Sequence, residues 1–372
     1  MAEIGLLPFA RVALQVATTV LPPYRSRFSK HQFTQPQLLA MLCLMRYEDW
    51  TYRETEVRLA EHGELRRVLG LWSVPDYTTL YRFLQRLDEG AIHQALGEVV
   101  RRLQEVRRRR RRRARVAVDA TGLAQGAVST FFVRRMHHHT QQPLPWRHWL
   151  KWMVVVDLDE QLVLAQSARR GPWNDCGQLP GLLETARQVT PIGLVLADAE
   201  FDSERNHTYV RQQLGAQSVI PAKRGKKTWK LRGVRAQMRA DFPRPLYRRR
   251  ALVETVFSAV KRKLSARAPG RSLPTQTRQA LLLGLAFNLY RLRHHRCHPA
   301  AHPRDCKDVN RAKPLPVLEG HPPGSNTGPA DYDSAAMPAA SCGTRRSTHS
   351  SRRRNFWILP LAVCGKVSTN ST

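Results

Sequence analysis

The spacing of apolar residues changes along the chain, and the first part has a helical period. In "TTLYRFLQRL", Leu80, Phe83, Leu84 and Leu87 recur at the i, i+3, i+4, i+7 spacing of a helix with one apolar stripe. The stretches "TQPQLLAMLCLM" and "TYRETEVRLA" both open with a Thr that is followed, one turn later, by Gln or Glu, which is the signature of a capping box. We therefore expect residues 34–90 to form helices.

Farther along the chain the pattern becomes typical of strands. "RVAVDA" and "GLVLADAEF" are short apolar runs, and "WLKWMVVVDLDEQLVLAQSARR" predicts a hairpin that turns at "DLDEQ". Helical patterns occupy "GQLPGLLETARQV", "SERNHTYVRQQL", residues 250–264 and residues 278–293. Strands first, followed by alternating strands and helices, predict an α/β fold with a mixed sheet and helices on its faces.

Two changes in composition divide the chain. A run of seven arginines cannot be buried and is typical of a linker or a nucleic-acid arm: Arg107, Arg108, Arg109, Arg110, Arg111, Arg112 and Arg113. From about residue 298 Pro, Gly, Ser, Ala and His dominate, and no apolar period remains. We predict a helical domain over 1–106, an Arg-rich linker over 107–113, an α/β domain over 114–297 and a disordered tail over 298–372.

The net charge of the chain limits the classes of partner that it is expected to bind. Lys and Arg number 61 against 29 Asp and Glu, which gives a net charge of +32. Such an excess repels itself unless a polyanion neutralises it, so nucleic acid is the expected partner. A membrane is not expected, because the longest apolar run, "NFWILPLAVCG", is too short for a span. Neither a secretory signal nor a paired cysteine framework is visible, so we expect a cytoplasmic protein.

The helices of residues 34–90 suit a helix-turn-helix DNA-binding unit, because they are short and the last of them is basic. On that interpretation Arg82 and Arg86, which lie off the apolar stripe, would contact DNA. An ordinary helical bundle explains the pattern equally well.

Three carboxylates are candidates for chemistry. Asp119 and Asp198 each end an apolar strand, and an acid there is costly unless something binds it. Glu254 is the only acid in the basic stretch "YRRRALVETVFSAVKRKL". Converging carboxylates suit hard divalent cations, and two such ions catalyse phosphoryl transfer. The simpler alternative is that Glu254 only relieves repulsion among the surrounding cations.

The helix that carries Glu254 can be drawn from its sequence. At about 100° per residue, Tyr247, Arg250, Glu254 and Lys261 share one face, with Glu254 at the edge of the buried side. The core-facing stripe would consist of Leu252, Val253, Val256, Phe257, Val260 and Leu264.

The same four residues carry a resemblance. Their Y-x2-R-x3-E-x6-K order matches the signature of DDE transposases of bacterial insertion sequences, which the chain resembles over about residues 33–295. "VAVDATGL" and "LADAEFDS" resemble the two Asp strands of that family, "GPWNDCGQLPGLL" the stretch between them, and "LAFNLYRL" the closing helix. One turn departs from the family's usual Lys-Gly-Tyr-Asp, because here it is Ala-Glu-Phe-Asp at 199–202.

The resemblance implies an RNase H-like core with Asp119, Asp198 and Glu254 as catalytic triad and ligands of two Mg²⁺ or Mn²⁺ ions. It also implies double-stranded DNA as the partner, with cleavage at inverted-repeat ends and strand transfer into target DNA. A homodimer in the DNA complex, in the cytoplasm and nucleoid of a bacterium, is implied as well. By the same resemblance, Tyr247 and Arg250 would contact phosphates near the transposon end, and Lys261 would hold the end backbone.

Other readings stay open. The chain could be a decayed transposase that only binds DNA, or a nuclease of the same fold. Trp229 could stack on an unpaired base, although burial is the commoner role of Trp. Asp175 and Asp202 precede helices and are expected to be N-caps, whereas Asp157 and Asp159 suit a hairpin turn.

Overall fold

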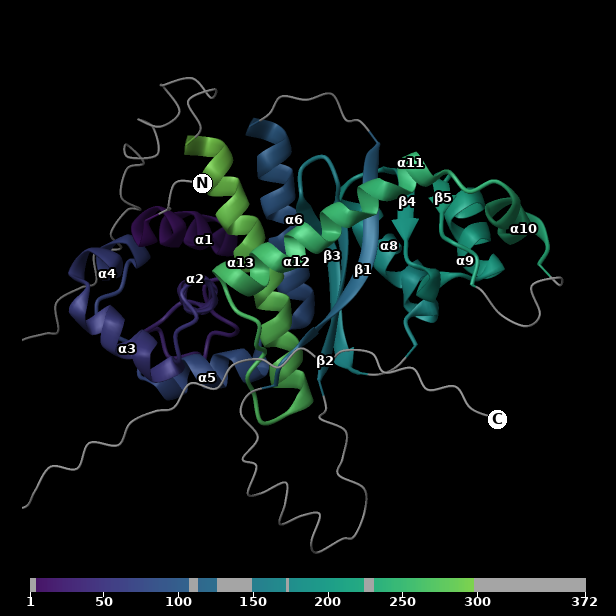
Figure 1. Ribbon diagram of the computed structural model, residues 1–372. Coiled ribbons are helices and arrows are strands. Elements are labelled where there is room, and N and C mark those ends of the chain that lie inside the picture. The colour runs from purple at the N-terminus through teal and green to yellow at the C-terminus, as the bar shows by residue number, and fades with distance from the viewer. Residues whose placement is uncertain (1–4, 107–112, 126–148, 172–173, 224–230, 298–372) are drawn as a thin grey trace, which may run out of the picture. The chain divides into compact units, whose positions relative to one another are not determined.

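The computed structural model describes residues 5–106, 113–125, 149–171, 174–223 and 231–297 (Figure 1). The chain begins with helices only. They are α1 (Leu6–Val20), α2 (Gln35–Tyr47), α3 (Tyr52–Glu61), α4 (Gly63–Leu69), α5 (Tyr77–Arg86) and α6 (Glu89–Val106). The helical expectation for residues 34–90 is therefore confirmed.

The local signals in these helices act as the sequence predicts. Thr34 with Gln37 and Thr51 with Glu54 form complete capping boxes at the starts of α2 and α3. On α5 the apolar stripe is buried, as Leu80, Phe83 and Leu84 show. No local signal marked helix α1 within the helical domain expected over 1–106, because its sequence carries no capping residue. It nevertheless buries an apolar face against α2.

The sheet has the strand order of an RNase H-like core. Its strands are β1 (Ala114–Leu123), β2 (Leu150–Asp157), β3 (Leu162–Arg170), β4 (Ile192–Ala197) and β5 (Gln217–Val219), in the order β3-β2-β1-β4-β5. Strands β1, β2 and β3 pair antiparallel, whereas β4 runs parallel to β1 and β5 parallel to β4. The mixed α/β sheet expected from the sequence is confirmed.

Helices follow and separate the later strands. They are α8 (Leu179–Val189), α9 (Glu204–Thr208), α10 (Gly233–Ala240), α11 (Arg244–Tyr247), α12 (Ala251–Lys263) and α13 (Leu273–Cys297). In Figure 1, α12 crosses the face of the sheet at β1, and β5 lies at the end of the sheet that α9 and α10 cover.

Helix α13 joins the helical half to the sheet. It packs against α2 and α6 on one side and against β3 on the other. Arg46 of α2 is buried and donates to the carbonyl oxygen of Arg267, just before α13, at 2.7 Å. The N-terminal helices and the sheet thus share one core through α13, and the predicted domain boundaries within it stay a prediction.

Some predicted features lie outside the described residues: Arg107 to Arg112, Trp229 and the whole segment 298–372. In the described part of the chain, no helix combines the length and the apolar character that crossing a membrane requires.

The contact between α13 and β3 depends on a glycine. Gln166 of β3 accepts from the Trp152 indole N–H at 3.0 Å and donates to the Leu281 carbonyl of α13 at 2.8 Å. A Cβ on Gly284 would collide with the Gln166 side chain. We therefore expect Gly284→Ala to lower the free energy of unfolding by about 1–3 kcal/mol, the usual cost of overpacking.

Chemical denaturation measures this effect, and Gly181→Ala is the matched control. Gly181 is also helical, but nothing lies within 4 Å of an added Cβ. The control should be neutral or gain up to about 1 kcal/mol from helix propensity. Equal stability changes in the two variants would contradict the close packing of α13 on β3.

Candidate active site

The strand register brings two of the predicted carboxylates together. Val118 of β1 pairs with Ala197 of β4, so the residues that follow them, Asp119 and Asp198, lie side by side. Each carboxylate accepts from the next backbone N–H in the chain, at 2.8 Å for Asp119 and at 2.5 Å for Asp198. The second bond caps the short 3-10 turn Ala199–Phe201, which therefore forms without the glycine of the family's usual turn.

Helix α12 lies over the same face of β1 as Asp119. Arg250, at its start, donates to the Asp119 carboxylate at 2.7 Å and to the Glu254 carboxylate at 3.1 Å. In the last turn of α12, Lys261 donates to the Thr121 hydroxyl at 2.6 Å. Since Asp119 and Thr121 are two residues apart on a strand, both contacts fall on one face of the sheet.

The predicted helix is interrupted before Glu254. Tyr247 ends α11, residues Arg248–Arg250 form a 3-10 turn, and only then does α12 begin. The drawing of Tyr247 on one continuous helix was therefore wrong. Neighbouring residues in an α-helix point about 100° apart, but here Arg249 binds Asp159 and its neighbour Arg250 binds Asp119. We attribute the tighter 3-10 turn to these two ion pairs.

The rest of the helix follows the sequence closely. Most of the expected stripe is buried, and only one member is half-buried: Val253, Val256, Phe257, Val260 and Leu264 are buried, and Leu252 is the exception. Tyr247 stays beside Arg250, with 5.7 Å between its ring centre and the guanidinium carbon. The Glu254 side chain is 62% exposed, so it lies farther from the buried side than expected.

Burial and charge act in opposite directions on these groups. Burial raises the pKa of Asp119 and the charge of Asp198 adds to the rise, against the Ala120 N–H and Arg250, which lower it. Burial alone would lower the pKa of Arg250, but Asp119 and its other neighbours raise it overall. Burial lowers the pKa of Lys261. The site therefore holds a carboxylate that is costly to ionise and a guanidinium that partly compensates for it.

This pKa shift predicts how stability depends on pH. A carboxyl whose pKa is raised by folding contributes stability at low pH and loses that contribution as the pH rises past its unfolded value, about 4. Asp119→Asn removes this loss. We expect the variant to gain stability relative to the original chain as the pH rises from acid to neutral, measured by denaturation at several pH values. A relative loss toward neutral pH would contradict the pKa direction.

The carboxylates fit a divalent cation, although they do not form a finished metal cluster. Among the described residues, no three His, Cys, Asp or Glu side chains lie close enough to hold an ion together. Asp119 and Asp198 are adjacent, but Glu254 reaches Asp119 only through Arg250. The donors are hard oxygens, and a guanidinium already bridges two of them. Because Glu254 is exposed, packing does not hold its side chain away from the pair.

The role of Asp175, an acid outside the candidate triad, was predicted wrongly from the sequence. Asp175 makes no capping bond to the turn that follows it. Instead it is fully buried and pairs with Lys151 of β2 and with Arg169 of β3, the latter at 3.0 Å. Lys151 also reaches Glu200, in the turn after Asp198, at 3.4 Å. A Lys within an apolar strand was the available signal, since a buried cation needs a buried acid.

Asp202 was likewise not the expected N-cap. Ser203 caps α9, while the buried Asp202 accepts from Arg235 of α10 at 2.9 and 2.7 Å and from the Lys223 backbone N–H at 2.9 Å. Asp202 thus fixes α10 against the segment that follows the second catalytic candidate. The turn interpretation of Asp157 is confirmed, because its carboxylate accepts from the backbone N–H groups of Asp159 and Glu160.

Unlike Arg250, three other predicted DNA-binding arginines that the structure describes lie apart from this centre. Arg82 and Arg86 are exposed on α5, where Arg86 also lies over the Phe83 ring. Arg113 donates to the Gly215 carbonyl at 2.9 Å, at the start of β1. None of the three contacts the carboxylates in the described structure, so any DNA contact they make is separate from the chemistry.

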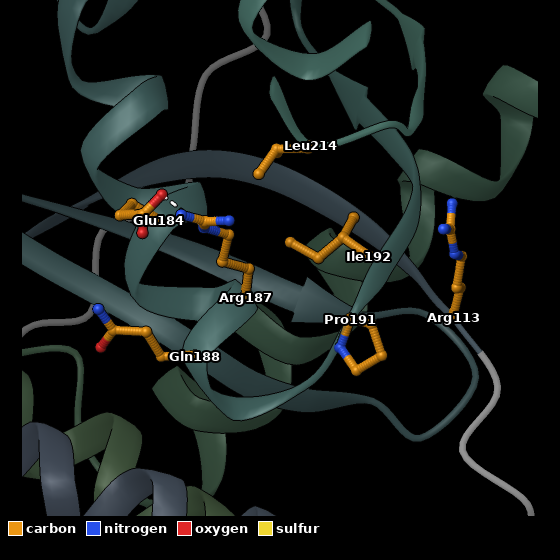
Figure 2. Close-up of a pocket in the computed structure, with 7 residues that line it drawn as sticks. All are labelled: Arg113, Glu184, Arg187, Gln188, Pro191, Ile192 and Leu214. Carbon is orange, nitrogen blue, oxygen red and sulfur yellow. Dashed lines mark hydrogen bonds and ion pairs between the residues drawn. The ribbon is translucent and has the colours of Figure 1, made fainter. Parts of the chain in front are cut away.

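A pocket of about 320 Å³ lies at the opposite end of the central strands (Figure 2). It is lined where β4 begins, at Pro191 and Ile192, whereas Asp198 follows the end of β4. Figure 2 shows Arg187 turned toward Glu184, with which it forms an ion pair, and Arg113 at the other side. With its cations already bonded to protein, this pocket offers no reactive group to a substrate.

Comparison with known protein families finds a match for the region that holds the three carboxylates. Residues 110–289 match the family model described as a transposase DDE domain. The match spans every strand of the sheet and α12, and it includes Asp119, Asp198 and Glu254. A search among curated proteins finds no match.

Proposed function

We propose that this chain, whose residues 110–289 match the transposase DDE domain model, is a DDE transposase of a bacterial insertion sequence. It would cut DNA at the inverted-repeat ends of that element and join the freed 3′ hydroxyl groups to target DNA. The observation that carries the proposal is the placement of Asp119 beside Asp198, with Arg250 linking Asp119 to Glu254. These three carboxylates are the proposed catalytic residues.

Two divalent ions, Mg²⁺ or Mn²⁺, are the proposed cofactors, and Asp119, Asp198 and Glu254 would hold them. When bound, such ions supply an activated water or hydroxyl and stabilise the leaving oxygen in phosphoryl transfer. Asp119 and Asp198 are fixed by the strand register and by hydrogen bonds to their own turns. Glu254 completes the set from the helix.

Arg250 has a proposed part in preparing the site. Without DNA its guanidinium neutralises Asp119 and bridges to Glu254. A DNA phosphate, like a carboxylate, offers a guanidinium two anionic oxygens that can accept a bidentate pair of hydrogen bonds. Transfer of Arg250 to a phosphate would free both acids and would hold the DNA beside them. Tyr247, next to Arg250, and Lys261, at the other end of the helix, would then contact the same strand.

The remaining cations are proposed to hold DNA outside the centre. Arg82 and Arg86 would contact the transposon end, and the run from Arg107 to Arg113 would add charge without sequence preference. Trp229 stays a candidate for stacking on an unpaired base. We further propose that the chain acts as a homodimer on DNA, in the bacterial cytoplasm at the nucleoid.

Joining separates this function from simple nuclease activity. Incubated with Mg²⁺, a labelled duplex that carries the element's own end and a circular target plasmid, the full chain should produce label covalently linked to the plasmid. A plain nuclease would release cut ends without joined product, and a decayed transposase would bind the labelled duplex without cutting it. A duplex with a scrambled end is the control for specific recognition.

A further inference from the structure

Two aromatic side chains stand almost fully in water on neighbouring loops of the helical half. Trp72, between α4 and α5, is 91% exposed, and Phe28, between α1 and α2, is 84% exposed. Aromatic rings carry large apolar areas, and isolated exposure of one such ring needs no explanation. Exposure of both rings on loops that touch each other is different, because a single partner can then reach both rings.

The first turn of α2 holds the two loops together. Gln35 donates to the Pro22 carbonyl at 3.1 Å, which anchors the loop that carries Phe28. Gln37 donates to the Leu69 and Gly70 carbonyls, at 3.1 and 2.7 Å, which anchors the loop that carries Trp72. The loops also touch directly, since Gln32 donates to the Ser73 hydroxyl at 3.3 Å. The first turn of α2 therefore anchors both the loop that carries Phe28 and the loop that carries Trp72.

The charge on the loop that carries Phe28 has one sign. The segment 22–33, "PPYRSRFSKHQF", contains three exposed cations and no acid. The Arg27 guanidinium lies over the Phe28 ring, 4.8 Å from its centre. We call this set the aromatic–basic surface; it consists of Tyr24, Arg25, Arg27, Phe28, Lys30 and Trp72.

A partner for this surface must be anionic and must offer flat apolar faces. A second copy of the chain would bring cations against cations, which costs energy at short range. Nucleic acid satisfies both needs, because its phosphates attract the cations and its bases present π faces. A base face is open only where pairing or stacking is interrupted, since a stacked duplex covers it.

We propose that the aromatic–basic surface binds DNA at unpaired or unstacked bases, with Trp72 and Phe28 stacking on bases while Arg25, Arg27 and Lys30 contact phosphates. The proposal rests on the proposed function only in taking the polyanion to be DNA. It adds a contact for non-duplex DNA that is separate from the catalytic carboxylates and from the arginines of α5.

Fluorescence anisotropy of the full chain without divalent metal tests the proposal. The probes are a labelled duplex with a short central run of mismatches and its fully paired counterpart. We expect Trp72→Ala and Phe28→Ala each to weaken binding to the mismatched duplex by roughly 5- to 100-fold, with a smaller loss on the paired duplex. Trp72→Tyr retains a ring and should keep most of the affinity. Val57→Ala, which truncates another exposed apolar side chain (53%), is the matched control and should change neither affinity.

Any one of five results would overturn the proposal. Unchanged affinity in both Ala variants would remove the surface from DNA binding, and equal losses on both duplexes, or no rescue by Tyr, would exclude stacking. Unchanged DNA binding with lost self-association in gel filtration, or with lost binding to vesicles rich in anionic lipid, would assign the surface to a different partner. Since the assay needs no cleavage, failure of the catalytic proposal would leave its outcome readable.

Discussion

Replacing Asp119 or Asp198 with Asn, or Glu254 with Gln, is expected to lower the rate of DNA end cleavage by at least about a hundredfold, because loss of a metal ligand exceeds the 10–100-fold cost of disturbing an outer-shell partner. DNA affinity should persist, since phosphate contacts by the many Lys and Arg residues supply it. Each substitution keeps the size of the side chain and removes only its charge. Cleavage is measured on a labelled duplex with the element's end, and binding is measured on the same duplex.

Glu200→Gln is the matched control for Glu254→Gln. The two glutamates are almost equally exposed, at 61% and 62%, and both lie near the aspartate pair. Glu200 contacts Lys151, whereas Glu254 is joined to Asp119 through Arg250. If loss of any acid near the site slows cleavage, both variants should fail. The triad assignment requires Glu200→Gln to cleave at close to the original rate.

The second large effect concerns stability. Asp175→Asn is expected to lower the free energy of unfolding by about 3–5 kcal/mol, because it leaves two cations without their buried counter-charge. Asp175 is fully buried, and its partner Lys151 is only 8% exposed. Denaturant unfolding measures the change, and the unfolding midpoint should fall clearly.

Asp159→Asn is the comparison that isolates burial. Asp159 also pairs with two cations, Arg115 and Arg249, but all three side chains are between 27% and 34% exposed. Water screens such pairs, so this variant should lose about 1 kcal/mol or less. Equal losses in the two Asn variants would mean that burial does not set the strength of the Asp175 network.

The fold could be predicted from sequence where the signals are local. The capping boxes, the α5 stripe and the β2–β3 hairpin depend on residues a few positions apart, and the structure has each of them. Helix α1 lacks such a signal, because tertiary burial rather than capping stabilises it. The break before α12 also lacks one, since we attribute it to ion pairs with strand β1 and with the β2–β3 turn, which are both distant in the sequence.

The candidate site was predictable for a different reason. An acid at the end of an apolar strand is conspicuous in sequence, and parallel pairing of β1 with β4 then places Asp119 beside Asp198. The role of Asp175 could not be predicted, because in the local sequence an Asp before a helix resembles an N-cap. Its partner Lys151 lies in another strand, so only the three-dimensional structure reveals the pair.

The most direct test of the account is the number of Mn²⁺ ions that the DNA-bound chain holds, counted by electron paramagnetic resonance with the element's end duplex present. The account predicts two ions per active site, the number that two-metal phosphoryl transfer uses. It also predicts fewer ions in Asp119→Asn and Glu254→Gln, with the Glu200→Gln protein unchanged. Full Mn²⁺ occupancy in both Asp119→Asn and Glu254→Gln would contradict the claim that these carboxylates form the metal-dependent centre.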